Sequence, residues 1–285
     1  MLTDRLQLQR LELKYIIREE RALEVRKFVS SYLVIDEFGA TFKNLSYPVH
    51  SLYLDSDDLQ SYWSTINGDK NRFKLRVRFY NGDPDAPVYF ETKRRMNNSI
   101  SKERGAVMRG YVGAILSGQC PTPRMMIDEE NTKHWMAVRH FCDLMRRSQA
   151  GPTAHVAYER EAWISPASNS VRVTMDRNVR CCPDHTVNLT TDMVDPAFPF
   201  DNPNRFEPPP AAKHVILELK FTGRYPHWFK DLVRGFGLVQ CSAAKYVDGI
   251  CIAGEERFSR LGCNRPGVAQ VRAMERRAFS LTCCD

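Results

Sequence analysis

The chain has 285 residues, of which 43% are hydrophobic and 26% are charged, and its net charge is +7. This composition is normal for a folded soluble protein that can bury a core. No stretch reaches the roughly 18 uncharged apolar residues of a membrane helix, and the charged start lacks the apolar segment of a signal peptide. The positive charge indicates an anionic partner without identifying it, since nucleic acid, phosphorylated metabolites and an anionic membrane all remain possible.

The chain contains nine cysteines and seven histidines. The adjacent pairs Cys181–Cys182 and Cys283–Cys284 have a poor geometry for bridging within each pair. No C-x-x-C spacing occurs, which argues against a zinc ribbon. The histidines show neither H-x-x-x-H nor H-E-x-x-H, which argues against a transition-metal catalytic site. We therefore expect reduced thiols and a cytoplasmic location.

The hydrophobic pattern of the first third of the chain predicts both strands and helices. In chain order these are a strand over 8–17, a helix over 19–32, a strand over 48–56, a short helix over 57–66, and strands over 72–83 and 86–95. The turn sequence Asn81-Gly82-Asp83 predicts that the last two strands form a hairpin. Asp55 and Asp57 follow a strand, where a helix cap or a turn is a better interpretation than metal binding.

The remainder of the chain continues the mixed pattern. It predicts helices over 106–118 and 131–147, strands over 154–164 and 170–182, a Pro-rich loop over 195–210, a strand over 214–221 and a helix over 225–238 that ends near Gly235 or Gly237. After about residue 254 the pattern dissolves. We expect one domain over 1–254 and a basic, poorly ordered tail over 255–285.

Charged side chains recur at a spacing of two in these strands, which places them on one face because successive side chains of a strand alternate. The sets are Arg10/Glu12/Lys14, Lys74/Arg76/Arg78, Glu91/Lys93/Arg95, Tyr158/Arg160, Arg172/Thr174/Asp176 and Glu218/Lys220. One interpretation is an antiparallel sheet with a solvated face. The other is an inverted antiparallel β-barrel, with a charged interior and helices packed outside. Such an interior would bind a polyanion, and its glutamates could ligate Mg²⁺ or Mn²⁺.

Eight segments of the sequence resemble the VTC polyphosphate polymerase domain family over about residues 8–252. They occur in the family's order: RLELKYII, SLYLDSDDLQSYW, KLRVRFY, YFETKRR, AYEREAW, VRVTMDRNV, VILELKF and AAKYVDGI. This family belongs to the triphosphate tunnel metalloenzymes, which are related to the CYTH adenylate cyclases and triphosphatases. The resemblance implies an α+β fold with an antiparallel β-barrel, the triphosphate tunnel, whose interior is charged and whose outside is wrapped by helices.

The resemblance also implies an activity, namely transfer of the γ-phosphate of ATP onto a growing polyphosphate chain with Mn²⁺ or Mg²⁺. The positions that match phosphate-contacting, catalytic residues of the family are Lys14, Arg76, Arg78, Lys93, Arg172 and Lys245. Glu218 matches the metal-binding glutamate. Strand parity alone adds four further phosphate-binding candidates: Arg160, Lys220, Arg95 and Lys74. The implied partners are ATP or another triphosphate, polyphosphate, and membrane proteins for export of the product.

Two positions depart from the family pattern. Arg10 replaces the first acid of the E-x-E-x-K motif of CYTH enzymes, which favours a single metal over two. Ala244 stands before Lys245 where the family often has serine, so a hydroxyl contact to phosphate is missing. A tunnel triphosphatase and a non-catalytic sensor of polyphosphate or inositol phosphate therefore remain alternatives. A nucleic-acid-binding protein is not expected, because the basic residues alternate with glutamates and no aromatic stacking platform is evident.

Overall fold

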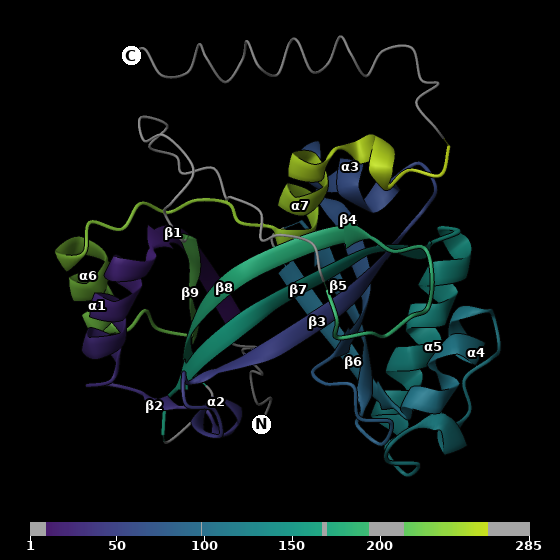
Figure 1. The fold of residues 1–285 in the computed structure, drawn as a ribbon, viewed down its shortest axis with the longest axis horizontal. Helices are drawn as coiled ribbons and strands as arrows, with labels where there is room; N and C mark the ends of the chain where they lie inside the picture. The colour runs from purple at the N-terminus through teal and green to yellow at the C-terminus, as the bar shows by residue number, and fades with distance from the viewer. Residues whose placement is uncertain (1–9, 98, 167–169, 194–213, 262–285) are drawn as a thin grey trace, which may run out of the picture.

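The computed structural model describes residues 10–97, 99–166, 170–193 and 214–261. They form a mixed α+β fold around one antiparallel sheet with the strand order β1-β9-β8-β7-β3-β4-β5-β6, and β2 pairs with β7 (Figure 1). The strands are β1 Arg10–Arg18, β2 Val34–Ile35, β3 Ser46–Asp55, β4 Asn71–Phe79, β5 Val88–Met96, β6 Ser99–Val107, β7 Gly151–Ile164, β8 Val171–Pro183 and β9 His214–Thr222.

Helices cover the outer face of this sheet and one end of its inner face. The α-helices are α1 Glu19–Val29, α2 Glu37–Ala40, α3 Gln60–Ile66, α4 Val112–Leu116, α5 Thr132–Arg147, α6 His227–Gly235 and α7 Lys245–Ala253. Three short 3₁₀ turns lie at Arg109–Tyr111, Pro123–Met125 and Glu255–Arg257. In Figure 1, α1 and α6 lie at one side of the molecule, α4 and α5 at the other, and α3 and α7 together above the sheet.

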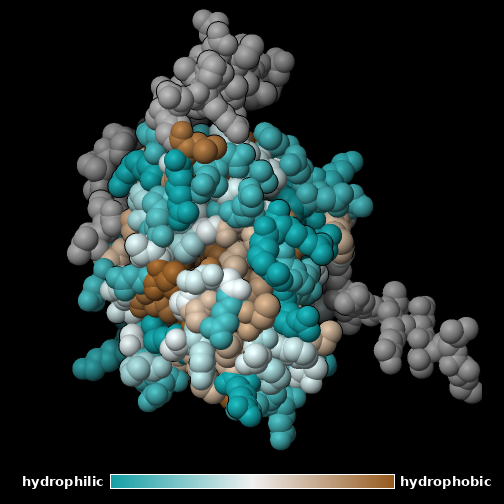
Figure 2. Space-filling view, turned by 90° about the vertical axis from the view of Figure 1, so that its right-hand side faces the viewer, coloured by the Kyte–Doolittle hydropathy of each residue, from teal (hydrophilic) through white to brown (hydrophobic). Residues whose placement is uncertain are grey.

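The outer face of the sheet is apolar and holds two packed cores. Val25 of α1 and Phe229 of α6 pack on β1, β8 and β9, and Phe141 of α5 packs on β4, β5 and β6. The contact of α5 with β6 is unusually close. A Cβ atom on Gly105 would lie 2.4 Å from the carbonyl oxygen of His134, so this position requires glycine. The exposed side that carries α4 and α5 is mostly hydrophilic, with a small apolar area near its middle (Figure 2).

The inner face of the sheet is charged along most of its length and apolar at one end. There, Tyr246, Val247 and Ile250 of α7 pack against inward side chains of β3, β7, β8 and β9. Asp55, at the end of β3, anchors this region. Its carboxylate accepts hydrogen bonds from the amides of Ser61 and Tyr62 in α3, at 2.8 and 3.0 Å, and from the Tyr246 hydroxyl, at 2.6 Å. Asp55 therefore binds the free amides at the start of α3, in agreement with the interpretation as a helix cap instead of a metal ligand.

The sheet curls so that strands from its two ends face each other across the charged interior. Glu12 and Lys14 on β1 act electrostatically on Lys93 of β5, although five strands separate β1 from β5 in the sheet order. The predicted α+β fold with a charged interior and outer helices is confirmed. The barrel differs in one respect: in the described residues no hydrogen-bonded ladder joins β1 to β6, so the sheet stays open between them.

The predicted elements and the structure disagree in four regions. The prediction of a helix over 106–118 is wrong at its start and missed β6, so that only 112–116 forms α4. The prediction also missed α7, and it missed β2 and α2 in the region before β3. Residues 255–261, which we assigned to the tail, pack against the domain: Phe258 is buried, and Glu255 accepts a hydrogen bond from the Tyr62 hydroxyl at 2.8 Å. The predicted loop over 195–210 and the rest of the tail lie outside the described residues.

Candidate functional site

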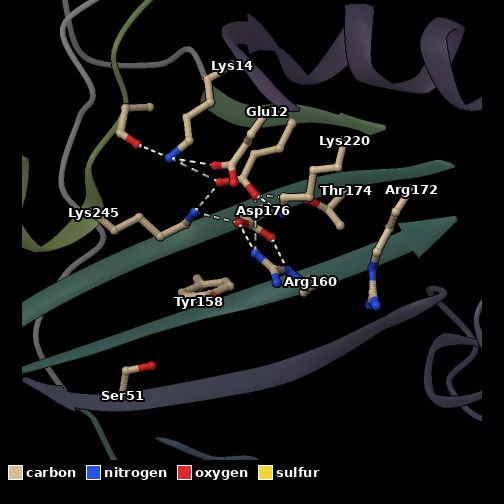
Figure 3. A network of polar contacts seen from close by, with 12 residues as sticks. Glu12, Lys14, Ser51, Tyr158, Arg160, Arg172, Thr174, Asp176, Lys220 and Lys245 are labelled. Carbon is tan, nitrogen blue, oxygen red and sulfur yellow. Dashed lines mark hydrogen bonds and ion pairs between the residues drawn. The ribbon is translucent and has the colours of Figure 1, made fainter. Parts of the chain in front are cut away.

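Glu218 of β9 is the centre of the first ionic cluster on the inner face, the Glu218 cluster. Four cations surround its buried carboxylate. Lys14 of β1 lies 3.5 Å away, Lys245 of α7 3.3 Å and Arg160 of β7 3.7 Å, and Lys220 of β9 forms a hydrogen bond to Oε2. Figure 3 shows these four side chains converging from different elements. Burial raises the pKa of Glu218, but the cations outweigh it and hold that pKa well below its ordinary value.

Asp176 of β8 is the second acid of this cluster and is fully buried. Arg160 binds it through two hydrogen bonds of 2.7 Å, and the Lys245 ammonium lies 2.6 Å from Oδ2. The same two cations lie over the ring of Tyr158, at 5.1 and 4.8 Å from its centroid. Although burial lowers the pKa of Lys245, the two carboxylates of Asp176 and Glu218 outweigh this effect and raise it above its ordinary value. Lys245 is therefore a permanent cation at neutral pH.

Lys14 lies between two carboxylates. Its Nζ is 3.2 Å from Glu12 and 3.5 Å from Glu218, and it donates to the carbonyl oxygen of Ala243 at 2.6 Å. The two acids therefore share one cation, which shows that the space between them suits positive charge. Burial and the charge of Glu218 raise the pKa of Glu12, but Lys14 and the neighbouring lysines hold it below its ordinary value. A cation between the two acids thus stabilises both in their ionised forms.

Glu91 of β5 is the centre of a second ionic cluster, the Glu91 cluster. Its carboxylate lies 2.6 Å from Arg76, 3.7 Å from Arg78, 2.7 Å from Lys102 and 3.5 Å from Arg104. The register explains this gathering, because Arg76 of β4 and Arg104 of β6 stand directly opposite Glu91. Burial raises the pKa of Glu91, and the cations lower it far more. One buried acid thus lies among four cations, so the cluster carries a net positive charge.

Lys74, Lys93 and Tyr53 lie between the two clusters. Burial lowers the pKa of Lys74 to about 8. The Tyr53 hydroxyl accepts a hydrogen bond from Arg76 at 3.1 Å, and its ring stacks on Tyr246 at 4.6 Å. Burial raises the pKa of Tyr53, but the nearby cations lower it to about 8. This stretch of the face is therefore short of negative charge.

Two predicted site residues lie neither in a cluster nor between the clusters. Arg172 of β8 donates to Asp36 at 3.0 Å and to the Tyr47 hydroxyl at 3.3 Å, and Figure 3 shows its side chain turned away from the Glu218 cluster. Arg95 lies exposed at the end of β5, where it donates to the carbonyl oxygen of Asn97 at 2.9 Å. Arg172 stays at the edge of the charged face, and Arg95 lies beyond it.

The structure adds several residues that the sequence did not single out as site residues. Lys102 and Arg104 were missed because 99–107 was not recognised as a strand, although they repeat the spacing of two found in the other strands. Glu12, Glu91 and Asp176 were placed on the correct faces, and the glutamates were considered as possible ligands of a divalent ion, but none of the three was named as a site residue. The sequence pattern that indicates them is the alternation of acids with cations along a strand. Their role as partners of cations on other elements becomes visible only when neighbouring strands are paired.

At the start of α7, Ala244 has no hydroxyl group that could contact phosphate. The amide of Ala244 donates to the carboxylate of Asp248 at 2.6 Å, so a side chain one turn later occupies the end of the helix. Lys245 follows as the first residue of α7 and points into the Glu218 cluster. The helix start therefore presents a cation without a neighbouring hydroxyl.

The described residues contain no group of three or more His, Cys, Asp or Glu side chains that would bind a metal without other ligands. Mg²⁺ and similar ions are often held by one or two carboxylates together with substrate phosphates. Glu218 and Glu12 fit this arrangement, because both are oxygen ligands and both already face a shared cation. The donor set thus fits a divalent ion that arrives with a phosphorylated ligand.

Within the described residues, no helix has the length and apolar character that crossing a membrane requires.

The sequence model of the VTC domain matches residues 9–253. Two relatives come from Schizosaccharomyces pombe. Vacuolar transporter chaperone complex subunit 4 is 23% identical over 275 residues, and subunit 2 is 20% identical over 282 residues. Each alignment covers 87% of this chain and 38% of the relative. The chain therefore spans less than two fifths of the length of these relatives.

Two solved structures of proposed adenylate cyclases are also similar. The Bacillus halodurans protein has a TM-score of 0.45 and 12% identity, covering 83% of this chain and 94% of that one. The Vibrio parahaemolyticus protein has a TM-score of 0.39 and 8% identity, covering 85% and 97%.

Proposed function

Because the chain belongs to the VTC domain family, we propose that it transfers the γ-phosphoryl group of ATP onto a growing chain of inorganic polyphosphate. The Glu218 cluster carries this proposal. It gathers Lys14, Arg160, Lys220 and Lys245 from four elements around one buried carboxylate. Phosphoryl transfer needs positioning and charge stabilisation more than covalent work by the protein. An array of converging cations supplies both.

We assign the cations of the face to phosphate binding. Lys14, Lys220 and Lys245 would hold the triphosphate, and Arg160 offers a planar fork for two phosphate oxygens. Arg76 and Arg78 of the Glu91 cluster, with Lys74 and Lys93 between the clusters, would hold the acceptor chain. The acceptor oxygen attacks in line and is already largely ionised, so the proposal needs no dedicated general base.

We further propose that Glu218, with Glu12, holds Mn²⁺ or Mg²⁺ together with the triphosphate. Such an ion would neutralise negative charge on the phosphates. Lys14 and the other cations of the cluster would then exchange carboxylate partners for phosphate oxygens. The low pKa of Glu218 keeps it ionised and ready to serve as a ligand.

We also propose a cytoplasmic location and membrane-protein partners that export the product. The described cysteines, Cys120, Cys142, Cys181, Cys182, Cys241 and Cys251, carry thiols and are not in disulfides, which supports a reducing compartment. The relatives are named as subunits of a complex, which supports partners for this chain as well.

The test is to incubate the purified protein with ATP and MnCl₂, with and without a short polyphosphate primer. Products are resolved on a gel and by phosphorus NMR. We expect a ladder of lengthening polymer with release of ADP, and we expect Glu218→Gln to abolish it. The control Glu103→Gln should keep it, because Glu103 lies on the face of β6 that points away from the charged face. Free phosphate without polymer would instead identify a triphosphatase. Tight triphosphate binding without turnover would identify a non-catalytic sensor.

A further inference from the structure

The charged face has an open side between β1 and β6, which we call the seam. These strands stand at the two ends of the sheet order, and no pairing joins them in the described residues. Among the described residues, the contacts along the edge of β1 lie near its middle, where Tyr15 bridges to Gln240 and the amide of Cys241 donates to the carbonyl oxygen of Lys14. In the described part of β6, one bridge lies at its last residue, Val107.

The exposure of the charged side chains increases toward the seam. The side of the charged face that carries Lys245 and Arg160, away from the seam, is called here the far wall. The side chains of these two residues are 9% and 13% exposed. On β1, Glu12 is 29% exposed. On β6, Arg104 and Lys102 are 38% and 47% exposed. The charged face is thus dry along its far wall and open to water along the seam.

The side of the seam formed by β5 and β6 carries an excess of positive charge. Lys102 stands opposite Lys93 and Arg104 opposite Glu91 in the register of these strands. Both lysines are exposed, and among the described residues Glu91 is the acid that pairs with Lys102 and Arg104. Arg104 is held in place by stacking on Tyr89, with its guanidinium carbon 3.5 Å from the ring centroid. An anionic polymer that reaches the seam therefore meets fixed cations before it meets the dry wall.

We propose that polyphosphate enters the charged face sideways through the seam, so that internal phosphates bind at Lys93, Lys102 and Arg104 and no free chain end is required. The proposal rests on the proposed function for the class of ligand and adds how that ligand is admitted. A closed tunnel has to be threaded from a chain end. An open edge lined by exposed cations binds any stretch of a flexible polyanion, because each internal phosphate carries a charge.

The test compares two forms of one long polyphosphate: the first has free ends, and the second carries a bulky protein on each terminal phosphate. Both compete with a fluorescent polyphosphate for the whole chain at fixed ionic strength. We expect the capped and free chains to bind within about threefold of each other. Lys102→Gln/Arg104→Gln should weaken both by about tenfold, since two phosphate contacts are lost. The matched control Lys133→Gln/Arg124→Gln removes two exposed cations elsewhere and should change neither.

The outcomes separate this inference from the proposed function. Tight binding of the free chain with a loss of more than about threefold for the capped chain overturns sideways entry and leaves the proposed function intact. Equal binding of both chains that the Lys102/Arg104 variant does not weaken overturns the placement at the seam. If neither polyphosphate nor tripolyphosphate binds, the proposed function fails and the inference fails with it.

Discussion

The Lys245 ammonium lies 2.6 Å from Asp176, so the first residue of α7 is bound to the fully buried acid of β8. Asp176 also has Arg160 as a bidentate partner, which keeps its charge compensated when Lys245 is lost. Lys245→Met should therefore leave the protein folded, with a cost of about 1–2 kcal/mol, while tripolyphosphate affinity falls about tenfold or more. Calorimetric titration and urea unfolding measure the two effects. An unchanged affinity would remove Lys245 from the phosphate site.

Glu91 compensates four cations, so its neutralisation should have opposite effects on stability and on anion binding. We expect Glu91→Gln to lower the free energy of unfolding by on the order of 2 kcal/mol. This value is smaller than that for breaking a fully buried ion pair, because two of the four cations are partly exposed. Tripolyphosphate should bind this variant more tightly than the parent and restore its stability.

Thermal unfolding with and without tripolyphosphate measures both effects of Glu91→Gln. Glu103→Gln is the control, because Glu103 belongs to the adjacent strand, is partly exposed and pairs only with His140 in the described contacts. It should shift stability by less than about 1 kcal/mol. Weaker tripolyphosphate binding in Glu91→Gln would show that Glu91 supports the ligand instead of competing with it.

Anion binding should decrease as pH rises through about 8. Burial lowers the pKa of Lys74 and Lys220 to about 8. Phosphate binds the protonated form of each lysine, so affinity is complete below this pH and is lost above it as the free protein gives up its protons.

Titrations with tripolyphosphate from pH 7 to pH 9.5 test this dependence. Lys220→Arg keeps its charge over the whole range and should flatten the decrease. Lys133→Arg, on the surface of α5, should leave the curve unchanged. An affinity that is independent of pH in the parent protein would exclude these lysines as phosphate contacts.

Asp55 holds α3 and α7 together at the apolar end of the face through bonds to Ser61, Tyr62 and Tyr246. Asp55→Asn replaces one acceptor oxygen with a donor, so at least one of these buried bonds is lost. We expect a loss of about 2–3 kcal/mol in the free energy of unfolding, measured by urea denaturation. Asp57→Asn, which changes an exposed acid 3.6 Å from Arg260, should cost less than about 1 kcal/mol. Equal effects of the two changes would contradict the anchoring role.

Gly105 sets the distance between β6 and α5. Gly105→Ala would place a Cβ atom 2.4 Å from the His134 carbonyl oxygen and from Val138. Since the helix backbone has to move, we expect a loss of about 1–3 kcal/mol and weaker polyphosphate binding, because β6 carries Lys102 and Arg104. Gly110→Ala is the matched control, as a Cβ atom added there would meet no described heavy atom within 4 Å. Wild-type stability of Gly105→Ala would show that α5 adapts freely.

The strand spacing predicts the face of each cation but not its partner. Glu218 and Lys220 could be placed together from sequence because they lie two residues apart on one strand. The convergence of Lys245 with Asp176 depends on a helix that crosses the end of the sheet, and no local pattern encodes that contact. Strand β6 escaped recognition because charges stand on both of its faces, Lys102 and Arg104 inward and Glu103 outward. Arg172 has the predicted parity, yet Asp36, far away in the chain, determines where its side chain lies.

Adjacent residues of α7 have unlike roles: Lys245 reaches the charged cluster, and Tyr246 fills the apolar end of the same face. A change in the length of the chain should therefore be tolerated before Ala244 far better than within the helix. Loss of a single residue between Lys245 and Ile250 would rotate one part of α7 against the other by about 100°. The tyrosine or the lysine would then point to solvent. Among natural variants of this domain, we expect insertions and deletions to be absent from this short stretch and to accumulate before it.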